Sequence, residues 1–448
     1  MQENKMGVMP VKKLIVTMSL PMMISMLVQA LYNIVDSVFV AQLSEEALTG
    51  VTLAFPMQNL MFAVAGGTGV GINAMLSKAL GEKKFDEADS AAGNGIVLNI
   101  AAALIFMCAS FMGAARAFIG TQTADPVIAR EGTTYLSIVM VLSIGMSAQV
   151  TMERLLQSTG RTFYTMITQA LGAIINIIMD PIMIFGLFGF PRLGVAGAAY
   201  ATIIGQSIAA ALGLFFNITK NTDIRFSWKI LKLKAETVKR IYFVGVPSIL
   251  MIAIGSVMTY LFNLILGTFS STAVAVFGVY FKLQSFFFMP VFGLNNGVIP
   301  VLAYNFGARN KDRIHEALRF SITLAFCIMC IGTLVFELMP ETLLKLFSAS
   351  DDMIAIGKVA LRNIAWHFPV AGLCIALGSV FQAFGRSFYS LIISLGRQIF
   401  VLIPVAYALS LTGKVENVWW AFLIAEFVSL CLTVLFFRRL NEGVIKTL

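Results

Sequence analysis

Asp36 is the first residue of the sequence with a clear chemical signal, because it is a carboxylate inside the apolar run from Leu14 to Val40. Gln29 and Asn33 precede it by seven and three residues, so the three polar side chains share one face of a helix. An ionised group at bilayer depth costs about 3 kcal/mol on insertion scales and usually marks a functional site. This stripe therefore predicts an ion site or a substrate pathway.

Asp180 ends a second stripe of the same kind. Gln169, Asn176 and Asp180 stand at offsets of 0, 7 and 11 residues, which again places them on one helical face. The helix of Asp180 runs opposite to that of Asp36, and both carboxylates lie toward the same side of the expected span, so they could meet at one depth. A pair of carboxylates there could bind Na⁺ or H⁺, and an ion gradient would then drive the protein.

The elements that position these stripes must be membrane helices. Hydrophobic residues make up 58% of the 448-residue chain and charged residues 12%, against about 45–50% and 25% in soluble proteins. This excludes a soluble enzyme, and the net charge of +9 comes from basic residues in short connections, which excludes nucleic-acid binding. We predict an all-α polytopic membrane protein with twelve transmembrane helices, at residues 14–39, 48–76, 93–118, 133–156, 163–188, 195–217, 241–267, 273–303, 316–339, 354–381, 388–411 and 418–437.

The longest polar connection divides the chain into two halves of six helices. We expect a first bundle in residues 1–217, a cytoplasmic linker at residues 218–240 and a second bundle in residues 241–448. With the N-terminus inside, 23 Lys and Arg fall on the cytoplasmic side, 7 fall on the outer side and 2 lie within helices. Positive charge favours the cytoplasmic side, so both termini are expected there.

The two halves also repeat in sequence. A shift of 226 residues places Pro21 on Pro247 and Gly81 on Gly307, among other matches. Each half crosses the membrane an even number of times, so the two bundles are expected to be related by a pseudo-two-fold axis along the membrane normal. Two such bundles facing each other form the cleft of an alternating-access transporter.

The repeat is lost at the carboxylates. It places Phe262 opposite Asp36 and, after a one-residue change of shift, Val405 opposite Asp180. A purely structural carboxylate would be expected in both halves, so the acidic pair indicates an ion site in the first half alone. The second half carries other ionisable residues at depth, namely Lys282, His367, Arg397 and Glu426.

Several interpretations of these residues stay open. Lys282 and Arg397 could snorkel, pair with each other or with a carboxylate, or meet an anion, and snorkelling or pairing is favoured. His367 is interpreted as a hydrogen-bonded histidine between helices. Glu426 is interpreted as a packed, partly neutral acid.

Other polar residues receive a structural interpretation. Glu153 and Arg154, at the end of the fourth helix, are interpreted as a surface pair. The glycines between Gly66 and Gly71 are expected to allow close helix packing, since no strand precedes them and no phosphate-binding lysine follows. No Walker motif is present, so ATP is not expected to drive the protein. The five cysteines stand within apolar runs, so neither a disulfide framework nor a metal knuckle is expected.

The sequence resembles the multidrug and toxic compound extrusion (MATE) family over essentially its whole length. The motifs that carry the resemblance are S-L-P at Ser19–Pro21, A-L-G-E at Ala79–Glu82, Q-S-T-G-R at Gln157–Arg161, N-x-x-x-D-P at Asn176–Pro181, G-V-A-G-A-A-x-A-T at Gly194–Thr202, N-F-G-A at Asn305–Ala308 and Q-A-F-G-R at Gln382–Arg386. The seventh helix has no Asp or Glu, which points to the DinF-like branch of the family.

The resemblance implies a multidrug antiporter that exports lipophilic, mostly cationic compounds in exchange for Na⁺ or H⁺. The cation-coupling residues that it implies are Asp36, Asn176, Asp180 and Thr202, of which the first three would be ligands of a bound Na⁺. Candidate residues of the substrate cavity are Gln29, Tyr32, Asn33, Gln58, Gln169, Lys282, Gln284 and Arg397, although hydrogen bonding between helices is the simpler interpretation of the four glutamines. No enzyme activity and no cofactor beyond the coupling ion are implied. The expected partners are small organic cations and the bilayer of the cell membrane, in which the protein would act as a monomer.

Two alternative functions remain at this point. A lipid-linked oligosaccharide flippase of the same superfamily would need several cationic residues in its cavity to receive a pyrophosphate, and Lys282 and Arg397 are only two. A channel would need a ring of pore-lining charges, which the sequence does not indicate.

Overall fold

Long apolar runs dictate helices, because hydrocarbon offers the backbone no hydrogen-bond partner and only intrahelical bonds satisfy every N–H and C=O group. The computed structural model describes residues 4–347 and 350–448, and in this part of the chain the regular elements are all helical. The sequence-based prediction of an all-α fold is confirmed.

The first half of the described chain contains nine α-helices and a 3₁₀ turn. They are α1 (Lys5–Val8), α2 (Val11–Ala41), α3 (Glu45–Gly81), α4 (Phe85–Phe111), α5 (Ala114–Gly120), α6 (Pro126–Val141), α7 (Ile144–Ser158), α8 (Thr162–Phe185), η1 (Leu187–Gly189) and α9 (Val195–Thr219).

The connection and the second half continue this series. Their elements are η2 (Trp228–Leu231), α10 (Ala235–Gly267), α11 (Ser271–Gly307), α12 (Lys311–Leu338), α13 (Pro340–Lys345), α14 (Asp351–Ala365), α15 (Phe368–Ala383), α16 (Ser387–Leu395), the π-helical segment η3 (Gly396–Leu402), α17 (Ile403–Ser410), α18 (Val415–Val418), α19 (Ala421–Leu440) and the π-helical turn η4 (Asn441–Ile445).

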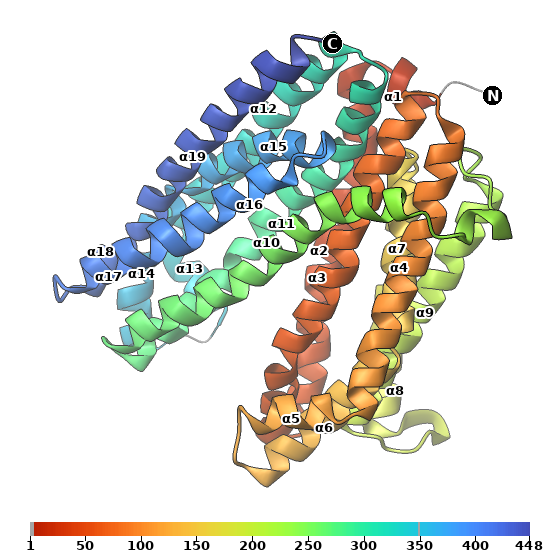
Figure 1. Cartoon of the computed structure of the whole chain (residues 1–448). Coiled ribbons are helices and arrows are strands. Elements are labelled where there is room, and N and C mark those ends of the chain that lie inside the picture. The colour runs from red at the N-terminus through yellow and green to blue at the C-terminus, as the bar shows by residue number, and fades with distance from the viewer. Residues whose placement is uncertain (1–3, 348–349) are drawn as a thin grey trace.

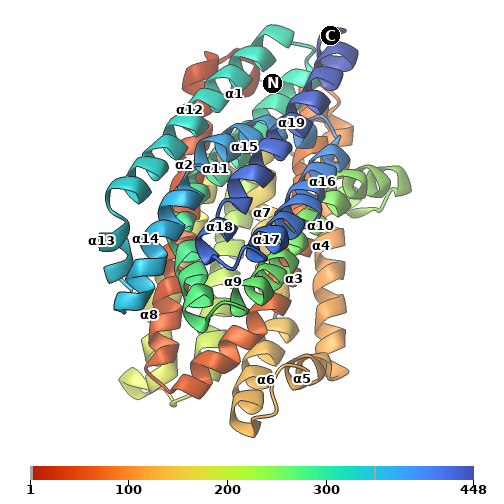
Figure 2. The same ribbon diagram turned by 90° about the vertical axis from the view of Figure 1, so that its left-hand side faces the viewer.

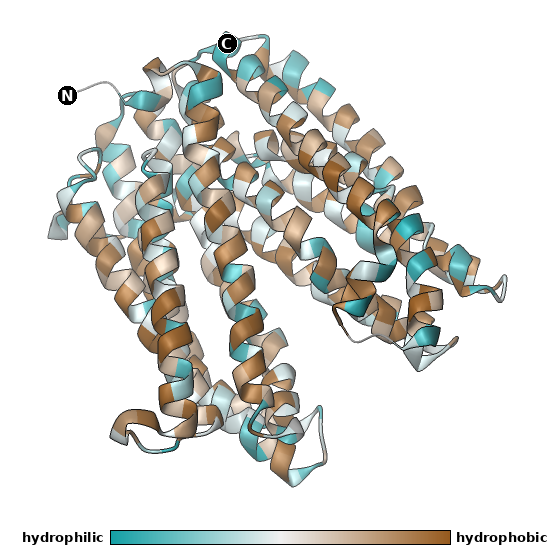
Figure 3. Ribbon diagram, turned by 180° about the vertical axis from the view of Figure 1, so that it is seen from behind, coloured by the Kyte–Doolittle hydropathy of each residue, from teal (hydrophilic) through white to brown (hydrophobic). Residues whose placement is uncertain are grey.

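The expected number of membrane spans agrees with the structure. Among the described residues, ten continuous helical stretches are long and apolar enough to cross a bilayer, and two bent helix pairs bring the number to twelve. Figure 3 shows the hydrophobic residues along the shafts of the helices and more of the hydrophilic ones at their ends and in the connections. This distribution is typical of a polytopic membrane protein.

Three predicted spans are interrupted, which corrects the sequence-based prediction. The expected helix at residues 93–118 ends at Phe111, because Gly113 adopts a positive φ of 88° and α5 begins after it. The expected helices at residues 133–156 and 354–381 each consist of two helices, with bends of 50° between α6 and α7 and 44° between α14 and α15.

The helices form two groups, which we name the N-lobe (α2 to α9) and the C-lobe (α10 to α19). The lobes lie together at the end that carries both termini and diverge toward the opposite end (Figure 1). Figure 2 views the molecule from the side of the C-lobe, with α14, α17 and α18 in front. The lobes meet mainly where α2 packs on α11 and α3 packs on α10.

Glycines allow this close approach of the lobes. In α3, Gly67 and Gly71 lie so close to α10 that an added Cβ would overlap backbone atoms of that helix. In α11, Gly293 and Gly297, which are the repeat partners of Gly67 and Gly71, lie equally close to the backbone of α2. The expectation of close helix packing is therefore confirmed for Gly67 and Gly71.

Gly81 and Gly307 show that the repeat in sequence is also a two-fold in space. A Cβ added to Gly81 would overlap the carbonyl oxygen of Tyr304, and one added to Gly307 would overlap the carbonyl oxygen of Lys78. Tyr304 and Lys78 are themselves 226 residues apart. Each lobe thus presents the same contact to the other at the end that carries the termini.

We expect Gly81→Ala to lower the free energy of unfolding by about 1 to 3 kcal/mol, because overpacking this contact forces α3 away from α11. Gly66→Ala in the same helix is the matched control, since the nearest atom to its added Cβ is 3.8 Å away and alanine is the better helix former. Thermal unfolding in detergent measures both variants. Equal midpoints for the two would contradict the tight contact at Gly81.

Candidate functional site

Facing glycines bring α8 and α9 close enough to share polar side chains. A Cβ added to Gly205 would lie 2.6 Å from the carbonyl oxygen of Gly172. Near this contact, Asn176 Nδ2 donates to Asp180 Oδ1 at 3.5 Å and to Thr202 Oγ1 at 3.3 Å. The three side chains are buried, and Asp180 is fully buried.

Asp36 reaches the same place because α2 packs along α8. The carboxyl groups of Asp36 and Asp180 lie close enough to interact electrostatically. Two ionised carboxylates close together repel each other, so this pair favours a proton or a cation beside it. Asp36 Oδ1, Asp180 Oδ2 and Asn176 Oδ1 are buried and have no hydrogen-bond partner in the described part of the chain, so these oxygens can accept it.

The chemistry of this donor set suits a proton or a hard cation. Carboxylate, amide and hydroxyl oxygens bind hard cations, whereas transition metals prefer imidazole or thiolate ligands. The structure thus brings together Asp36, Asn176, Asp180 and Thr202, the four residues that the family resemblance implies. Oxygen ligands alone do not distinguish Na⁺ from H⁺.

Two tyrosines extend the acidic site. Tyr32 stands one turn before Asp36 on α2, within electrostatic range of both Asp36 and Glu153. Tyr135 of α6 is buried, accepts a hydrogen bond from Gln58 Nε2 at 3.1 Å and lies within electrostatic range of Asp36. Sequence reasoning misses Tyr135, because its place in the site depends on the contact with Gln58 of α3 and not on a repeat along α6.

The other substrate-cavity candidates are distributed over both lobes. Gln169 of α8 donates to Glu153 of α7 at 2.7 Å, a bond between helices of the N-lobe. Gln284 accepts a hydrogen bond from the Tyr280 hydroxyl within α11 at 2.6 Å. The N-lobe contains Gln29, Tyr32, Asn33, Gln58 and Gln169, whereas the C-lobe contains Lys282, Gln284 and Arg397.

Glu153 is buried, so the predicted surface pair of Glu153 and Arg154 is wrong. Its two carboxylate oxygens accept hydrogen bonds from Gln149 Nε2 at 2.9 Å and from Gln169 Nε2 at 2.7 Å. Successive residues of a helix point about 100° apart. Glu153 therefore faces the interior of the N-lobe, whereas the Arg154 guanidinium donates to Asn296 Oδ1 of the C-lobe at 3.2 Å.

The C-lobe has no counterpart of the acidic pair at the position of Asp36. Phe262, the repeat partner of Asp36, is fully buried among aromatic rings. Its ring centroid lies 4.6 Å from that of Phe277 and 5.0 Å from that of Phe422. An apolar cluster thus replaces the carboxylate in the second half.

The ionisable residues of the C-lobe adopt three different environments. Arg397 Nη1 lies 3.0 Å from Glu426 Oε2, so pairing with a carboxylate is the interpretation that agrees with the structure, and the buried Glu426 is a paired acid. His367, the residue before α15, has its Nδ1 2.6 Å from the carbonyl oxygen of Ile364 near the end of α14, and its ring lies between Phe288 of α11 and Phe422 of α19. Lys282 is exposed.

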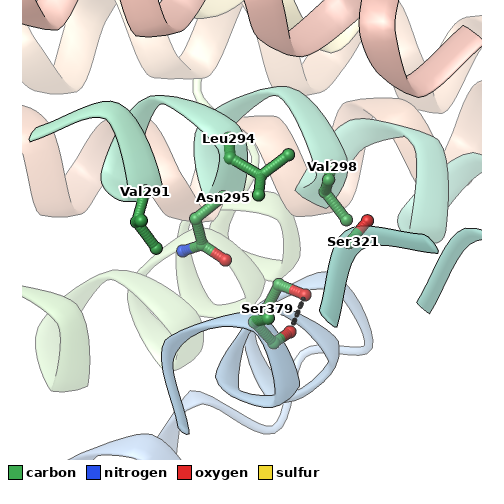
Figure 4. A pocket seen from close by; sticks show the side chains of 7 residues that line it. Val291, Leu294, Asn295, Val298, Ser321 and Ser379 are labelled. Carbon is green, nitrogen blue, oxygen red and sulfur yellow. Dashed lines mark hydrogen bonds between the residues drawn. The ribbon is translucent and has the colours of Figure 1, made fainter. Parts of the chain in front are cut away.

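A crevice in the C-lobe between α11, α12 and α15 proves too narrow to hold a water molecule (Figure 4). Asn295 and Ser379 line it, and the repeat places Gly69 and Arg154 of the N-lobe at the equivalent positions. In the N-lobe the Arg154 side chain packs over Gly69, where an added Cβ would lie 2.7 Å from Arg154 Cγ. The crevice is therefore a packing gap left where the C-lobe has no arginine.

We expect Glu153→Ala to lower the free energy of unfolding by about 2 to 4 kcal/mol, because it leaves two amide donors unpaired and opens a cavity. Glu153→Gln preserves the volume and one acceptor, so its expected cost is about 1 kcal/mol. Thermal unfolding in detergent measures both variants, with the exposed Glu416→Ala as the control. An unchanged midpoint for Glu153→Ala would show that its hydrogen bonds are not formed.

Comparison with known proteins identifies the family. The MatE family model matches the chain twice, at residues 21–182 and 247–408. The chain is 27% identical over 417 residues to the multidrug export protein MepA of Staphylococcus haemolyticus, with 92% of this chain and 89% of the relative covered. It is 26% identical over 407 residues to the FAD transporter of Shewanella oneidensis, with 89% and 88% covered.

Solved structures share the fold. A MATE transporter in complex with MaL6 gives a TM-score of 0.93 at 24% identity, with 100% of both chains covered. A MOP superfamily transporter from Pyrococcus furiosus, described as having a binding pocket of reverse polarity, also gives 0.93 at 24% identity, with 99% of both chains covered. Because the family model covers more than half of the sequence in two copies, this chain belongs to the MatE family, the multidrug and toxic compound extrusion family of membrane transporters.

Proposed function

We propose that the protein is a secondary active multidrug efflux antiporter, which exports lipophilic and mostly cationic compounds in exchange for Na⁺ or H⁺. The observation that carries this proposal is the pair of Asp36 and Asp180, whose neighbouring carboxyl groups favour a proton or a cation beside them. Such a site favours ion uptake when it is closed from water. It can therefore couple an ion gradient to transport. The similarity to MepA supports the multidrug class of substrate.

The charge distribution supports an orientation with both termini in the cytoplasm of a cell-membrane protein. The end at which the lobes meet carries both termini (Figure 1) and the Lys- and Arg-rich connections. Positive charge in short connections favours the cytoplasmic side. In this orientation the lobes diverge toward the outside, so the conformation corresponds to the outward-facing state of an exporter.

The proposed cycle uses the acidic site twice. In the outward-facing state Asp36 and Asp180 take up Na⁺ or H⁺, which neutralises the charge that attracts a cationic substrate, and the substrate leaves. The helix α2 contains the buried Pro21, which provides a position at which this helix can bend during the change of state. After inward opening the ion leaves to the cytoplasm and a new substrate enters.

Drug export is favoured over lipid-linked oligosaccharide flipping by the charges of the two lobes. A pyrophosphate group would require several unpaired cations around one cavity. Glu426, at 3.0 Å, balances the charge of Arg397, so Lys282 is the one cation of the two without an ion pair among the described residues, and the interior of the N-lobe carries carboxylates. This arrangement suits organic cations better than a diphosphate.

We expect Asp36→Asn and Asp180→Asn each to reduce ethidium export from proteoliposomes at least tenfold. Asparagine has nearly the same size, so folding is preserved, but it cannot take up a proton or supply the negative charge that binds a cation. Asp352→Asn, which changes an exposed aspartate at the start of α14, is the control. Export by Asp36→Asn at the wild-type rate would show that coupling lies elsewhere.

We expect an imposed Na⁺ gradient or pH gradient to drive ethidium against its own gradient, because an antiporter couples the two fluxes. Applying the two gradients separately to wild-type proteoliposomes identifies the coupling ion. Asp180→Asn should respond to neither gradient. Ethidium flux that needs no counter-gradient would instead indicate a channel.

A further inference from the structure

Arg397 and Glu426 form an ion pair at a depth where lipid headgroups do not reach. The span Ser387–Ser410 contains Arg397 ten residues after its start and thirteen before its end. At the rise of a helix this corresponds to roughly 15 to 20 Å from either end. Glu426 lies five residues after the start of α19, within the span Val415–Ile445, and its side chain is only 3% exposed.

The pair faces the interior of the C-lobe. The lipid-facing side of the same span is marked by Phe400, which is 71% exposed, and Tyr407, which is 59% exposed. The Arg397 guanidinium instead meets the buried Glu426, and Tyr280 of α11 lies within electrostatic range of it. Snorkelling to the membrane surface does not explain this orientation.

The Arg397 side chain has unused binding capacity. A guanidinium has five N–H donors, and in the described structure Arg397 makes one hydrogen bond, from Nη1 to Glu426 Oε2 at 3.0 Å. Its side chain is 30% exposed, although Glu426 beside it is almost fully buried. Glu426 thus holds the guanidinium from the buried side, and the remaining donors are open to a ligand.

The scaffold does not require this ion pair. The repeat places Gly172 of α8 at the position of Arg397, and Gly172 packs directly on the backbone of α9. The N-lobe therefore joins its equivalent helices without any charge, whereas a buried ion pair contributes little or nothing to stability. The seven-residue π-helical segment Gly396–Leu402, which contains Arg397, is a second departure from regular structure, and such segments are frequent at functional sites.

We propose that Arg397 is a binding residue for the carboxylate of amphiphilic substrates, and that Glu426 is its positioning residue. A guanidinium binds a carboxylate through two parallel hydrogen bonds. A monoanion suits the site better than a phosphate, because the pair is neutral and each further charge at this depth adds to the cost of burial. The inference rests on the proposed export function, and it assigns one residue pair of the C-lobe to the recognition of a substrate carboxylate.

Two dyes with the same cationic ring system test the proposal. Rhodamine 110 has a free carboxylate, and rhodamine 123 is its methyl ester. We expect wild-type proteoliposomes to export both dyes. In the double variant Arg397→Gln/Glu426→Gln, the export rate of rhodamine 110 should fall at least tenfold relative to that of rhodamine 123.

The double variant is chosen because Arg397→Gln alone would leave Glu426 buried without its partner and could prevent folding. Lys414→Gln, which removes an exposed charge from the same lobe, is the control and should export both dyes normally. The inference would be overturned if the double variant exported both dyes at equal rates. It would also be overturned if the wild type exported rhodamine 123 but not rhodamine 110. Failure of the wild type to export either dye would contradict the proposed function itself.

Discussion

The low polarity of the membrane interior is the constraint on which the rest of this structure depends, because each buried charge there needs a partner. The chain provides these partners in three ways. Asp36 and Asp180 form the acidic pair to which we assign the coupling ion, Glu153 accepts hydrogen bonds from Gln149 and Gln169, and Arg397 pairs with Glu426. The first arrangement alone brings two like charges together, and Asp36 Oδ1 and Asp180 Oδ2 have no hydrogen-bond partner among the described residues.

The same constraint explains how much of the fold could be predicted from the sequence. Apolar runs must become helices in hydrocarbon, so the all-α class and the number of spans follow from composition and periodicity. The break at Gly113 and the bend before α15, where Pro369 stands in the first turn, have local signals that a search for apolar runs alone does not use. The bend between α6 and α7 falls at Leu142 and Ser143, and Gly145 in the first turn of α7 is its local signal.

The residues of the candidate site could be predicted from the sequence where polar side chains repeat along one face of a helix. They could not be predicted where the site depends on contacts between different helices. The stripes of Asp36 and Asp180 repeat with helical spacing, and the structure brings the two residues together. Tyr135 and Glu153 take part in the site through contacts between helices, with Gln58 of α3 and Gln169 of α8. Adjacency in sequence suggested that Glu153 pairs with Arg154, but neighbouring helical residues face different directions, and only the fold shows which direction is buried.

The duplicated scaffold separates what holds the lobes together from what each lobe can bind. Glycines at repeat-related positions, such as Gly81 and Gly307, make matching contacts between the lobes, so this interface requires the same small residue on both sides. The interiors carry no such requirement, because Phe262 packs in an aromatic cluster where the other lobe has Asp36. A change of charge inside one lobe therefore leaves the contact between lobes intact. This freedom allows an acidic site in the N-lobe and an arginine in the C-lobe to exist on one symmetric frame.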